Sequence, residues 1–355
     1  MALFVGDPLP ALRLPGGSNP SYAVDTAGGR YVALGLLSGA QDDAVEAGIA
    51  LIEANRQRFN DIHACIFGIV PDLPRWRERC RDQVPGVRWL FDKDGAVAKS
   101  LSGQAEPTWL LLDPTLRVLT RSGPERSQSV LEDVSSLPPP DLHMGTQAFA
   151  PVLLIPRIFE PDFCEALIDT YGTLGGEPSG FMREIDGVTR LLSDTRHKRR
   201  SDALLPEGDL RERVRARIIR RLVPQIQRAF QYSATRMERH LIACYDSETG
   251  GYFRPHRDNT TKGTAHRRFA VSINLNQDFD GGELRFPEYG SRTYRPPLGG
   301  AVVFSCSLLH EATSVTRGKR YAFLPFLYDD DAAQIREANL KYLDPALLEA
   351  GTTPG

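Results

Sequence analysis

The stretch from Leu241 to Tyr328 decides the fold of the C-terminal half of this chain. It opens with LIACYDSETGGYFRPHRDNTT (241–261) and closes with GGAVVFSCSLLHEATSVTRGKRYAFLPFLY (299–328). Between these ends lie two further apolar runs, FAVSINLN (269–276) and GGELRFPEY (281–289). Short apolar runs separated by Gly-rich turns are typical of antiparallel strands. The stretch therefore predicts a β-rich domain.

A histidine and an aspartate in this stretch have the spacing of metal ligands. His256-Arg257-Asp258 is an H-x-D triplet after a Gly-rich turn. On a strand, residues two apart point to the same face, so His256 and Asp258 can aim at one point. His310, which follows the distant apolar run 301–304, is the candidate third ligand. Two histidines and one carboxylate form the facial triad of non-haem Fe(II) oxygenases, whereas zinc hydrolases more often use three histidines or two histidines and a glutamate.

Arg320 supports this metal hypothesis from the far end of the stretch. It lies ten residues after His310 and enters the strand run 321–328. An H-x-D triplet alone is more often a pair of ordinary loop residues, and an arginine after a turn can belong to a surface ion pair. A charged side chain inside a barrel would be costly without a partner, and a guanidinium fork suits a carboxylate. The distal carboxylate of 2-oxoglutarate is the partner that we expect.

The order of these motifs resembles the 2-oxoglutarate- and Fe(II)-dependent dioxygenases of the prolyl 4-hydroxylase type, including the hypoxia-factor prolyl hydroxylases. The matching features are ACY-x6-Y-x3-H-x-D-N, S-x-N-L-N, GGELRFPE and H-E-x3-V-T-x-G-x-R-Y. The resemblance implies that His256, Asp258 and His310 bind Fe(II). It also implies that Arg320 and Tyr245 bind 2-oxoglutarate. The alternative for Tyr245 is a core aromatic residue with a satisfied hydroxyl.

The chain departs from the animal enzymes of this family at two places. The strand around Ile273 and Asn274 lacks a second tyrosine that would contact the cosubstrate. Phe326 and Tyr328 stand in place of a single closing tryptophan. These departures affect the cosubstrate pocket and leave the proposed iron ligands unchanged.

The resemblance implies a double-stranded β-helix, or jelly roll, of two antiparallel sheets with flanking helices. It implies hydroxylation of an unactivated C–H bond, with 2-oxoglutarate decarboxylated to succinate and CO2. The cofactors would be Fe(II), 2-oxoglutarate and O2, with ascorbate as a candidate reductant. We expect the substrate to be a prolyl or other residue of a protein or peptide, by analogy with the family.

Three other functions stay open at this point. The chain could hydroxylate a free amino acid or small metabolite, or it could be a nucleic-acid dealkylase with the same iron chemistry. It could also be a scaffold whose barrel is a pseudo-enzyme, although the joint presence of His256, Asp258, His310 and Arg320 argues against this. Of the possible partners, we expect no membrane and do not favour nucleic acid.

The composition of the chain is that of an ordinary soluble globular protein. Its 355 residues, 25% charged and 41% hydrophobic, have room for two or three domains. The net charge of -2 gives no global attraction to nucleic acid or anionic membranes. We see no apolar run of membrane-spanning length and no signal-peptide pattern. Five widely spaced cysteines without a CxxC motif indicate reduced thiols, so we expect a cytoplasmic protein.

Residues 1–135 alternate strand and helix signals, which predicts a three-layer α/β domain. Apolar strand runs are expected at 31–37, 63–70, 87–92 and 108–113. Helices are expected at 42–59, 73–81 and 130–134.

This half resembles a peroxiredoxin, within the thioredoxin fold. The motifs that carry the resemblance are VGDPLPALRLP (5–15), FDKDGAVAKSL (91–101) and EPTWLLLDP (106–114). Pro107 stands where that fold has a cis-proline before a strand, with a surface-turn proline as the alternative. A peroxiredoxin needs a thiolate after the first central strand, but residues 38–46 contain no cysteine. We interpret Cys65 and Cys80 as small buried apolar residues, so this domain is expected to be non-catalytic and could pair two chains as a homodimer.

Residues 136–149 form a Pro-rich linker, in which Pro138–Pro140 should be extended and stiff. The dioxygenase-like domain is expected at 150–330 and a partly ordered C-terminal tail at 331–355, with a short helix from 332 to 340.

Flanking helices of the second domain are expected at 158–172 and 209–231, and Pro224 should kink or restart the second of them. The segment 190–221 is rich in arginine, with 11 basic against 5 acidic residues. A solvated helix face is the simpler explanation, and a surface for an acidic partner or nucleic acid is the alternative.

Overall fold

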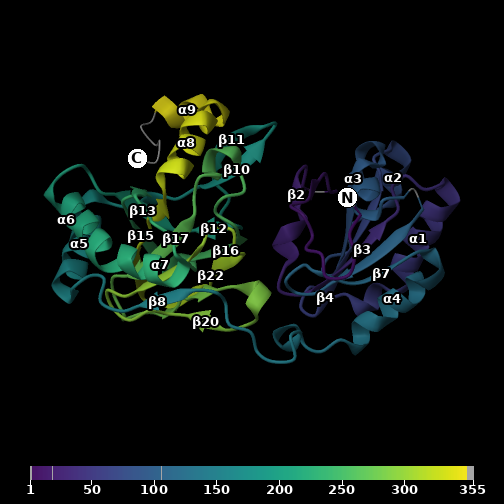
Figure 1. Cartoon of the computed structure of the whole chain (residues 1–355), viewed down its shortest axis with the longest axis horizontal. Coiled ribbons are helices and arrows are strands. Elements are labelled where there is room, and N and C mark those ends of the chain that lie inside the picture. Colours follow the sequence, from purple (N-terminus) through teal and green to yellow (C-terminus); the bar gives the residue numbers. More distant parts are fainter. Residues whose placement is uncertain (1, 18, 105, 350–355) are drawn as a thin grey trace. The chain divides into compact units, whose positions relative to one another are not determined.

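The computed structural model describes residues 2–17, 19–104 and 106–349, and it divides the chain into two compact units (Figure 1). One unit comprises Met1–Ala150 together with Pro287–Ser291. The other comprises Pro151–Phe286 and Arg292–Gly355. No helix within the described ranges combines the length and apolar character needed to cross a membrane.

The first unit is built on a five-stranded sheet with the strand order β5-β4-β3-β6-β7. Its strands are β3 (Tyr31–Leu36), β4 (Ala64–Pro71), β5 (Val87–Asp92), β6 (Thr108–Leu112) and β7 (Val118–Ser122). The three strands β5, β4 and β3 are parallel to one another, β6 is antiparallel to β3, and β7 is antiparallel to β6. A short antiparallel pair joins β1 (Arg13–Leu14) and β2 (Tyr22–Ala23).

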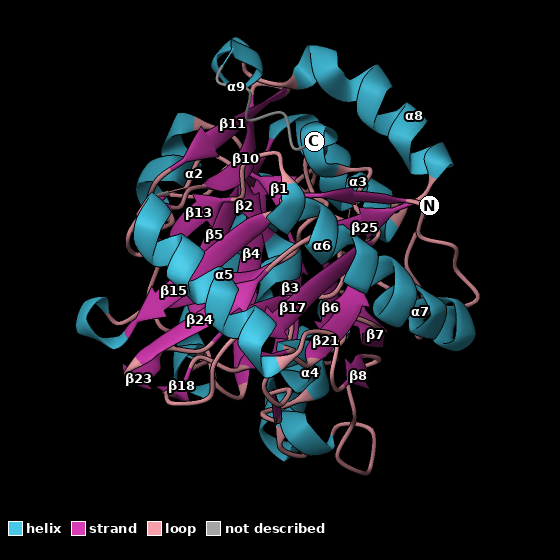
Figure 2. Ribbon diagram, turned by 90° about the vertical axis from the view of Figure 1, so that its left-hand side faces the viewer, coloured by secondary structure: helices cyan, strands magenta, loops and turns pink. Residues whose placement is uncertain are grey.

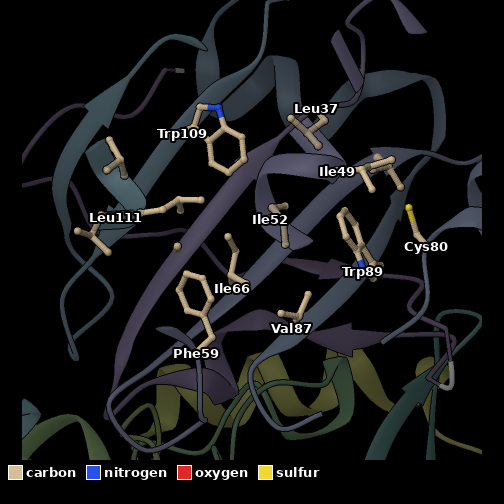
Figure 3. Packing of buried hydrophobic residues seen from close by; sticks show 14 of the residues in the cluster. Leu37, Ile49, Ile52, Phe59, Ile66, Cys80, Val87, Trp89, Trp109 and Leu111 are labelled. Atoms are coloured by element: carbon tan, nitrogen blue, oxygen red, sulfur yellow. The ribbon is translucent and has the colours of Figure 1, made fainter. Parts of the chain in front are cut away.

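Helices and N-terminal segments cover both faces of this sheet, because alternate strand residues point to opposite sides. The helices are α1 (Asp42–Ala54), α2 (Pro74–Arg79), α3 (Ala96–Ser102) and α4 (Ser127–Asp133). On β3, Tyr31 and Ala33 join the cluster that includes residues of α1, α2 and α4, and Figure 3 shows part of this core. Val32 and Leu34 join the opposite cluster, which includes residues of α3. The α/β character predicted for this half is therefore present.

The prediction of a cis-proline at Pro107 is wrong. The cis peptide bond that the described residues contain is Val84–Pro85. Pro107 directly precedes β6 and is buried. The prediction that Pro107 lies directly before a strand is confirmed, but the prediction that its peptide bond is cis is not.

The second unit contains two large antiparallel sheets. The larger follows the order β14-β25-β17-β24-β15-β13-β9, with β21 pairing β17 and β8. Its strands are β8 (Leu153–Ile155), β9 (Glu177–Pro178), β13 (Ser201–Leu204), β14 (Arg236–Glu238), β15 (Leu241–Asp246), β17 (Phe269–Asn274), β21 (Ala301–Ser305), β24 (Lys319–Phe323) and β25 (Phe326–Tyr328). The smaller sheet follows β12-β16-β22-β19-β20. Its strands are β12 (Lys198–Arg199), β16 (Tyr252–His256), β19 (Leu284–Arg285), β20 (Thr293–Tyr294) and β22 (His310–Ala312).

Helices close one side of the larger sheet through a shared apolar cluster. They are α5 (Pro161–Leu174), α6 (Asp209–Arg217) and α7 (Val223–Phe230). The interruption predicted at Pro224 is confirmed, because a π-helical turn, Ile218–Leu222, separates α6 from α7. Pro224 lies in the first turn of α7, where the missing N–H costs little.

Two short antiparallel pairs and a helical tail complete the second unit. The pairs are the hairpin β10 (Phe181–Ile185) with β11 (Val188–Leu192), and β18 (Asp280–Gly281) with β23 (Val315–Arg317). The tail contains α8 (Asp330–Asn339) and α9 (Pro345–Glu349), and α9 lies beside the hairpin (Figure 1, Figure 2). The tail is thus ordered through residue 349, further than predicted, and residues 350–355 lie outside the described range.

Candidate metal and cosubstrate site

The three predicted metal ligands come together where two interior strands of the smaller sheet end or begin. His256 ends β16 and His310 begins β22, and these residues are directly paired in register. A register shift lies between Phe253 and His256 on β16. Because of this shift, the side chains of Phe253 and His256 lie on the same face of the sheet although they are three positions apart. The side chains of His256, Asp258 and His310 place one ligand atom each within 4.8 Å of the others.

The prediction that His256 and Asp258 share a strand is wrong in one respect. The strand ends at His256, and Asp258 lies in the turn that follows. The backbone N–H of Asp258 donates to the carbonyl oxygen of Cys306, 2.9 Å away. This bond to the segment after β21 fixes the turn, so turn geometry and not strand alternation aims the carboxylate.

Hydrogen bonds fix the orientation of both histidine rings. Nδ1 of His256 lies 2.8 Å from the carbonyl oxygen of Arg254, and Nδ1 of His310 lies 3.0 Å from that of Leu308. A carbonyl only accepts, so each Nδ1 carries the proton and each Nε2 keeps a lone pair. The two Nε2 atoms lie 3.5 and 3.3 Å from the oxygens of Asp258. Two imidazole nitrogens and one carboxylate, all turned to one point, fit a divalent metal ion.

Burial and neighbouring charge set the ionisation that a metal requires. Burial, reinforced by the nearby His310, lowers the pKa of His256 to about 4, so the ring is neutral at physiological pH. Burial alone would raise the pKa of Asp258, but His310 and His256 hold that pKa below its ordinary value. Metal binding therefore does not have to compete with protons at either residue.

Aromatic rings pack against the two histidines. The ring of Phe253 stacks on His256 with centroids 3.5 Å apart, and the ring of Phe304 meets His310 at 4.5 Å. These contacts restrict the imidazoles to one orientation and limit access of water to the site.

A buried ionic network behind the site was not predicted from the sequence. Glu238 is completely buried and accepts from Nε of Arg267 at 2.6 Å, while Nε2 of His266 lies 2.8 Å from its other oxygen. Nη1 of Arg267 also donates to the backbone carbonyl oxygen of Asp258 at 3.4 Å. The only sequence signal was an acidic residue beside an apolar strand run, which does not reveal its partner.

Arg320 is buried on β24, but its guanidinium is not arranged as the sequence suggested. Nε and Nη2 both donate to Oδ1 of Asn274, at 3.2 and 3.1 Å, and Nη2 also donates to the hydroxyl of Ser272 at 2.7 Å. Nε and Nη2, the two nitrogens that could bind a carboxylate side-on as a fork, are thus already hydrogen-bonded within the protein. Nη1 makes no hydrogen bond to any described residue and is the group left for a carboxylate. Asn274, noted as a departure from the animal enzymes, is the residue that holds Arg320 in place.

Tyr245 lies on β15 directly opposite Arg320 in register, and its side chain is buried. The guanidinium carbon of Arg320 lies 5.3 Å from the centre of the Tyr245 ring. The hydroxyl oxygen of Tyr245 accepts a hydrogen bond from Nη1 of Arg200 at 3.3 Å. The structure therefore brings the two predicted cosubstrate residues together and adds Arg200, which the sequence did not single out.

The closing aromatic residues support the buried network. Arg267 lies over the ring of Phe326 with 4.1 Å between the guanidinium carbon and the ring centre. Tyr328 meets the ring of His266 edge-on, with centroids 5.0 Å apart. The two aromatic residues that replace a tryptophan therefore pack on Arg267 and His266, the two partners of Glu238.

The cysteines of the first unit have the properties of buried structural residues. Cys65 lies within β4 and Cys80 at the C-terminal end of α2, and both are buried. Burial raises the pKa of each thiol to about 12. Ser38, the hydroxyl nearest to the expected nucleophile position, is buried and donates to the carbonyl oxygen of Asp92. These groups offer no thiolate at neutral pH.

Comparison with known proteins gives a family match over part of the chain. Residues 240–328 match the model of the 2OG-Fe(II) oxygenase superfamily. A PKHD-type hydroxylase of Synechococcus sp. (strain JA-2-3B'a(2-13)) is 32% identical over 129 residues, which are 33% of this chain and 55% of that protein. A PKHD-type hydroxylase of Pseudomonas fluorescens (strain Pf0-1) is 37% identical over 91 residues, 23% of this chain and 39% of that protein. The chain thus spans about half or less of the length of these relatives.

Solved structures give matches of low similarity. A Pseudomonas putida prolyl-4-hydroxylase has a TM-score of 0.40 at 19% identity, covering 53% of this chain and 96% of that one. A prolyl hydroxylase from Trichoplax adhaerens, in complex with a hypoxia inducible factor peptide, has a TM-score of 0.43 at 17% identity, covering 61% and 97%. A putative protein disulfide isomerase from Bacteroides thetaiotaomicron has a TM-score of 0.32 at 13% identity, covering 38% and 93%. The cofactors of the matched oxygenase segment are Fe(II), 2-oxoglutarate and O2.

Proposed function

We propose that this chain is a 2-oxoglutarate- and Fe(II)-dependent dioxygenase that hydroxylates a C–H bond. The observation that carries the proposal is the convergence of His256, Asp258 and His310, with both Nε2 atoms turned toward the carboxylate. A triad of this composition leaves coordination positions open for a bidentate 2-oxo acid and O2. Bound Fe(II) would supply oxidising power, so that one oxygen atom enters the substrate while 2-oxoglutarate becomes succinate and CO2.

The chain's own residues position the reactants and protect the site. His256, Asp258 and His310 hold the metal, and the donors of His256 and Asp258 are already in the required ionisation state. Arg320 and Tyr245 bind the distal carboxylate of the cosubstrate, with Asn274 and Ser272 keeping Arg320 rigid. Phe253 and Phe304 limit the water that reaches the reacting centre. Rigid positioning lowers the entropic cost of bringing three reactants together.

We assign a prolyl or other residue of a protein or peptide as the substrate class. The support is the name of the related proteins, PKHD-type hydroxylases, together with the motif resemblance. A free amino acid or small metabolite is the alternative within the same chemistry.

The structure lowers the support for nucleic acid as a substrate. Several arginines of the 190–221 segment form ion pairs with acidic side chains of the same unit. Arg217 and Arg221 both pair with Glu160, and Arg211 pairs with Glu207. Paired arginines on a helix face fit the simpler explanation of a solvated surface.

For the whole chain we propose a two-domain organisation. Residues 1–135 form a thioredoxin-like domain without peroxidase activity, 136–149 a linker, 150–330 a jelly-roll oxygenase domain and 331–355 the tail. The first domain would serve as an assembly or substrate-presenting surface, for example by pairing two chains. The support is the mixed sheet of the first unit, together with its buried thiols of raised pKa.

The proposed function is tested by oxygen incorporation. The full-length protein is incubated with Fe(II), 2-oxoglutarate and O2 and with separate pools of lysate proteins, peptides and metabolites. Mass spectrometry should find a mass gain of one oxygen atom in a protein or peptide, dependent on 2-oxoglutarate. A gain confined to metabolites would select the small-molecule alternative. Absence of any oxygen gain, together with absence of succinate, would overturn the assignment and favour a pseudo-enzyme.

A further inference from the structure

Arg200 is a buried cation whose role the proposed iron chemistry does not explain. Its side chain is 5% exposed and pairs with Asp202, with Nη2 2.6 Å from the carboxylate. Ser201 and Asp202 on β13 pair in register with Cys244 and Ala243 on β15. Continuing that register places Arg200 opposite Tyr245. The sheet therefore aligns Arg200, Tyr245 and Arg320 in one row across neighbouring strands.

Both guanidinium groups of this row lie close to the phenol ring. The carbon of the Arg200 guanidinium lies 5.7 Å from the centre of the Tyr245 ring, and that of Arg320 lies 5.3 Å from it. Arg200 also has a buried Nε without a hydrogen-bond partner among the described residues. Asp202 is the carboxylate that hydrogen-bonds Arg200 and also lies near Arg239, 3.5 Å away. Within the row, two guanidinium groups, those of Arg200 and Arg320, stand against the single carboxylate of Asp202, which favours an anionic ligand.

The direction of one hydrogen bond decides what Tyr245 can do. A guanidinium has donors and no acceptor, so the bond from Nη1 of Arg200 must end on the hydroxyl oxygen of Tyr245. The hydroxyl proton of Tyr245 cannot be given to Arg200 and has no acceptor among the described residues. It is therefore left to be donated to an incoming ligand. Polarisation of the phenol by a cation also strengthens that donation.

We propose that Arg200 is a positioning residue for the cosubstrate, which acts through Tyr245 by directing the phenol proton toward the distal carboxylate of 2-oxoglutarate. This inference rests on the proposed function, because it takes that carboxylate as the ligand beside Arg320. The carboxylate then accepts from Nη1 of Arg320 and from the hydroxyl of Tyr245. This arrangement compensates for the guanidinium fork that Asn274 occupies and for the second tyrosine that the chain lacks.

A purely structural role for Arg200 would not account for its hydrogen bond to Tyr245. Pairing with Asp202 requires only Nη2, and Ser179 accepts a second bond from the same nitrogen at 3.2 Å. Neither contact requires Nη1 to point at a phenol. Burial alone would lower the pKa of Arg200, but the charge of Asp202 holds that pKa above its ordinary value. The cation that polarises Tyr245 is therefore permanent.

The test is a set of binding titrations with the full-length protein loaded with Mn(II), without turnover. Calorimetry measures the affinity for 2-oxoglutarate in the wild type, Tyr245→Phe, Arg200→Met and the double variant. Loss of one hydrogen bond to a charged group is worth roughly tenfold or more in affinity. We expect Tyr245→Phe to weaken binding about tenfold. Arg200→Met should weaken it roughly three- to tenfold, and the double variant should bind no more than about twofold more weakly than Tyr245→Phe.

A second ligand separates positioning from general damage to the site. A 2-oxo monoacid without a distal carboxylate should bind wild type and Arg200→Met within about twofold, because its recognition does not involve Tyr245. Arg239→Met is the matched control, since Arg239 contacts Asp202 but makes no hydrogen bond to Tyr245. That control should leave 2-oxoglutarate affinity unchanged. Because Arg200→Met removes the nearest cation from Asp202 and leaves it with Arg239 and the Ser179 hydroxyl, the variant Arg200→Met/Asp202→Asn is titrated as well and should give the same result.

Two results would overturn the inference while leaving the proposed function intact. Wild-type affinity for 2-oxoglutarate in both Arg200 variants would show that Tyr245 needs no such partner. Additive losses in the double variant would show that Arg200 contacts the cosubstrate itself. By contrast, a wild-type protein that binds Mn(II) but not 2-oxoglutarate would contradict the proposed function itself.

Discussion

His256 and His310 illustrate how backbone carbonyls orient the side chains of a candidate metal site at the level of single residues. Each Nδ1 is tied to a carbonyl oxygen two residues earlier, which turns Nε2 toward Asp258. Asp258 is fixed in turn by its own N–H bond to Cys306 and by Arg267 at its carbonyl oxygen. The donors are thus placed by hydrogen bonds that do not require the metal.

The first residue-level prediction concerns Arg320. Arg320→Met should weaken 2-oxoglutarate binding roughly ten- to over a hundredfold, because hydrogen bonds to charged groups contribute about 1.5–3 kcal/mol. Arg320→Lys should recover part of the affinity, since a point charge remains but the bonds to Asn274 and Ser272 are lost. Titration of the Mn(II)-loaded protein measures both effects. Equal affinity in wild type and Arg320→Met would assign the carboxylate to another cation.

The second residue-level prediction concerns pH and the metal-free protein. Burial lowers the pKa of His240 to about 4 from an ordinary value of 6.5. The unfolded chain therefore takes up this proton first, so stability is present above pH 6.5 and is lost as the pH falls toward 4. For Glu238, burial alone would raise the pKa, but Arg267 and His266 lower it to about 2 from 4.5, which adds a further loss of stability between those values.

Urea denaturation of the metal-free protein at a series of pH values measures this dependence. The midpoint should fall from pH 6.5 downward, and His240→Gln should make the fall between pH 6.5 and pH 4 less steep, with His256 keeping part of it, while the fall below pH 4 stays unchanged. A midpoint that is constant between pH 7 and pH 4 would show that these groups titrate alike in the folded and unfolded chain.

At the scale of elements, long periodic segments were predictable and short irregular ones were not. The apolar strands β3 and β4 and the amphipathic α1 follow from their periodicity, and the break before α7 follows from Pro224. The hairpin β10–β11 was missed, because none of its strand residues except Thr189 is buried and no apolar alternation marks it. The extent of the tail was underestimated because its contacts are with distant residues.

The three candidate metal ligands could be predicted as a group from the sequence because their spacing is local to two motifs, and the structure brings them together. The partner of Arg320 could not be found, since Asn274 lies on another strand and the pairing depends on sheet register. The same holds for Glu238 and Arg267, which meet only in the folded chain. Motif spacing thus identified the chemistry, while the supporting contacts required the fold.

The element-level prediction concerns the C-terminal tail. The N–H of Asp344 donates to the carbonyl oxygen of Thr189 at 3.0 Å, and Asn339 donates to that of Lys262 at 2.8 Å. Lys262 also lies over the ring of Tyr342, 4.1 Å from its centre. These contacts tie the tail to the hairpin and to the loop that follows the metal-ligand turn.

A chain that ends at Asp329 should therefore lose protection from hydrogen exchange at 181–192 and 261–264. The strands β15, β17 and β24 should keep their protection, because they lie in the interior of the larger sheet. Asp344→Ala keeps the backbone bond to Thr189 but removes the carboxylate that lies 3.7 Å from Arg190 of the hairpin, so this milder variant should increase exchange at the hairpin alone. Unchanged exchange at the hairpin in the truncated chain would show that contacts with the tail do not stabilise the hairpin.

At the scale of the whole molecule, the chain combines a unit whose described thiols are buried and a unit with a candidate metal site. We predict no thiol-dependent consumption of hydrogen peroxide, because burial raises the pKa of Cys65 and Cys80 to about 12 and leaves almost no thiolate. A coupled peroxidase assay on the full-length protein measures this. Peroxide consumption that disappears in Cys65→Ser or Cys80→Ser would make the chain a two-activity redox enzyme.

The central claim is that His256, Asp258 and His310 form an iron site that decarboxylates 2-oxoglutarate. It is tested most directly by succinate formation with Fe(II), 2-oxoglutarate and O2 in the absence of substrate. The wild type should form succinate, and His256→Ala and Asp258→Ala should fall to the level of the metal-free protein, because two remaining ligands cannot fix the metal. Asp280→Ala, which removes an exposed carboxylate paired with Arg317, should behave as wild type. Succinate formation at the wild-type rate in His256→Ala or Asp258→Ala would contradict the account.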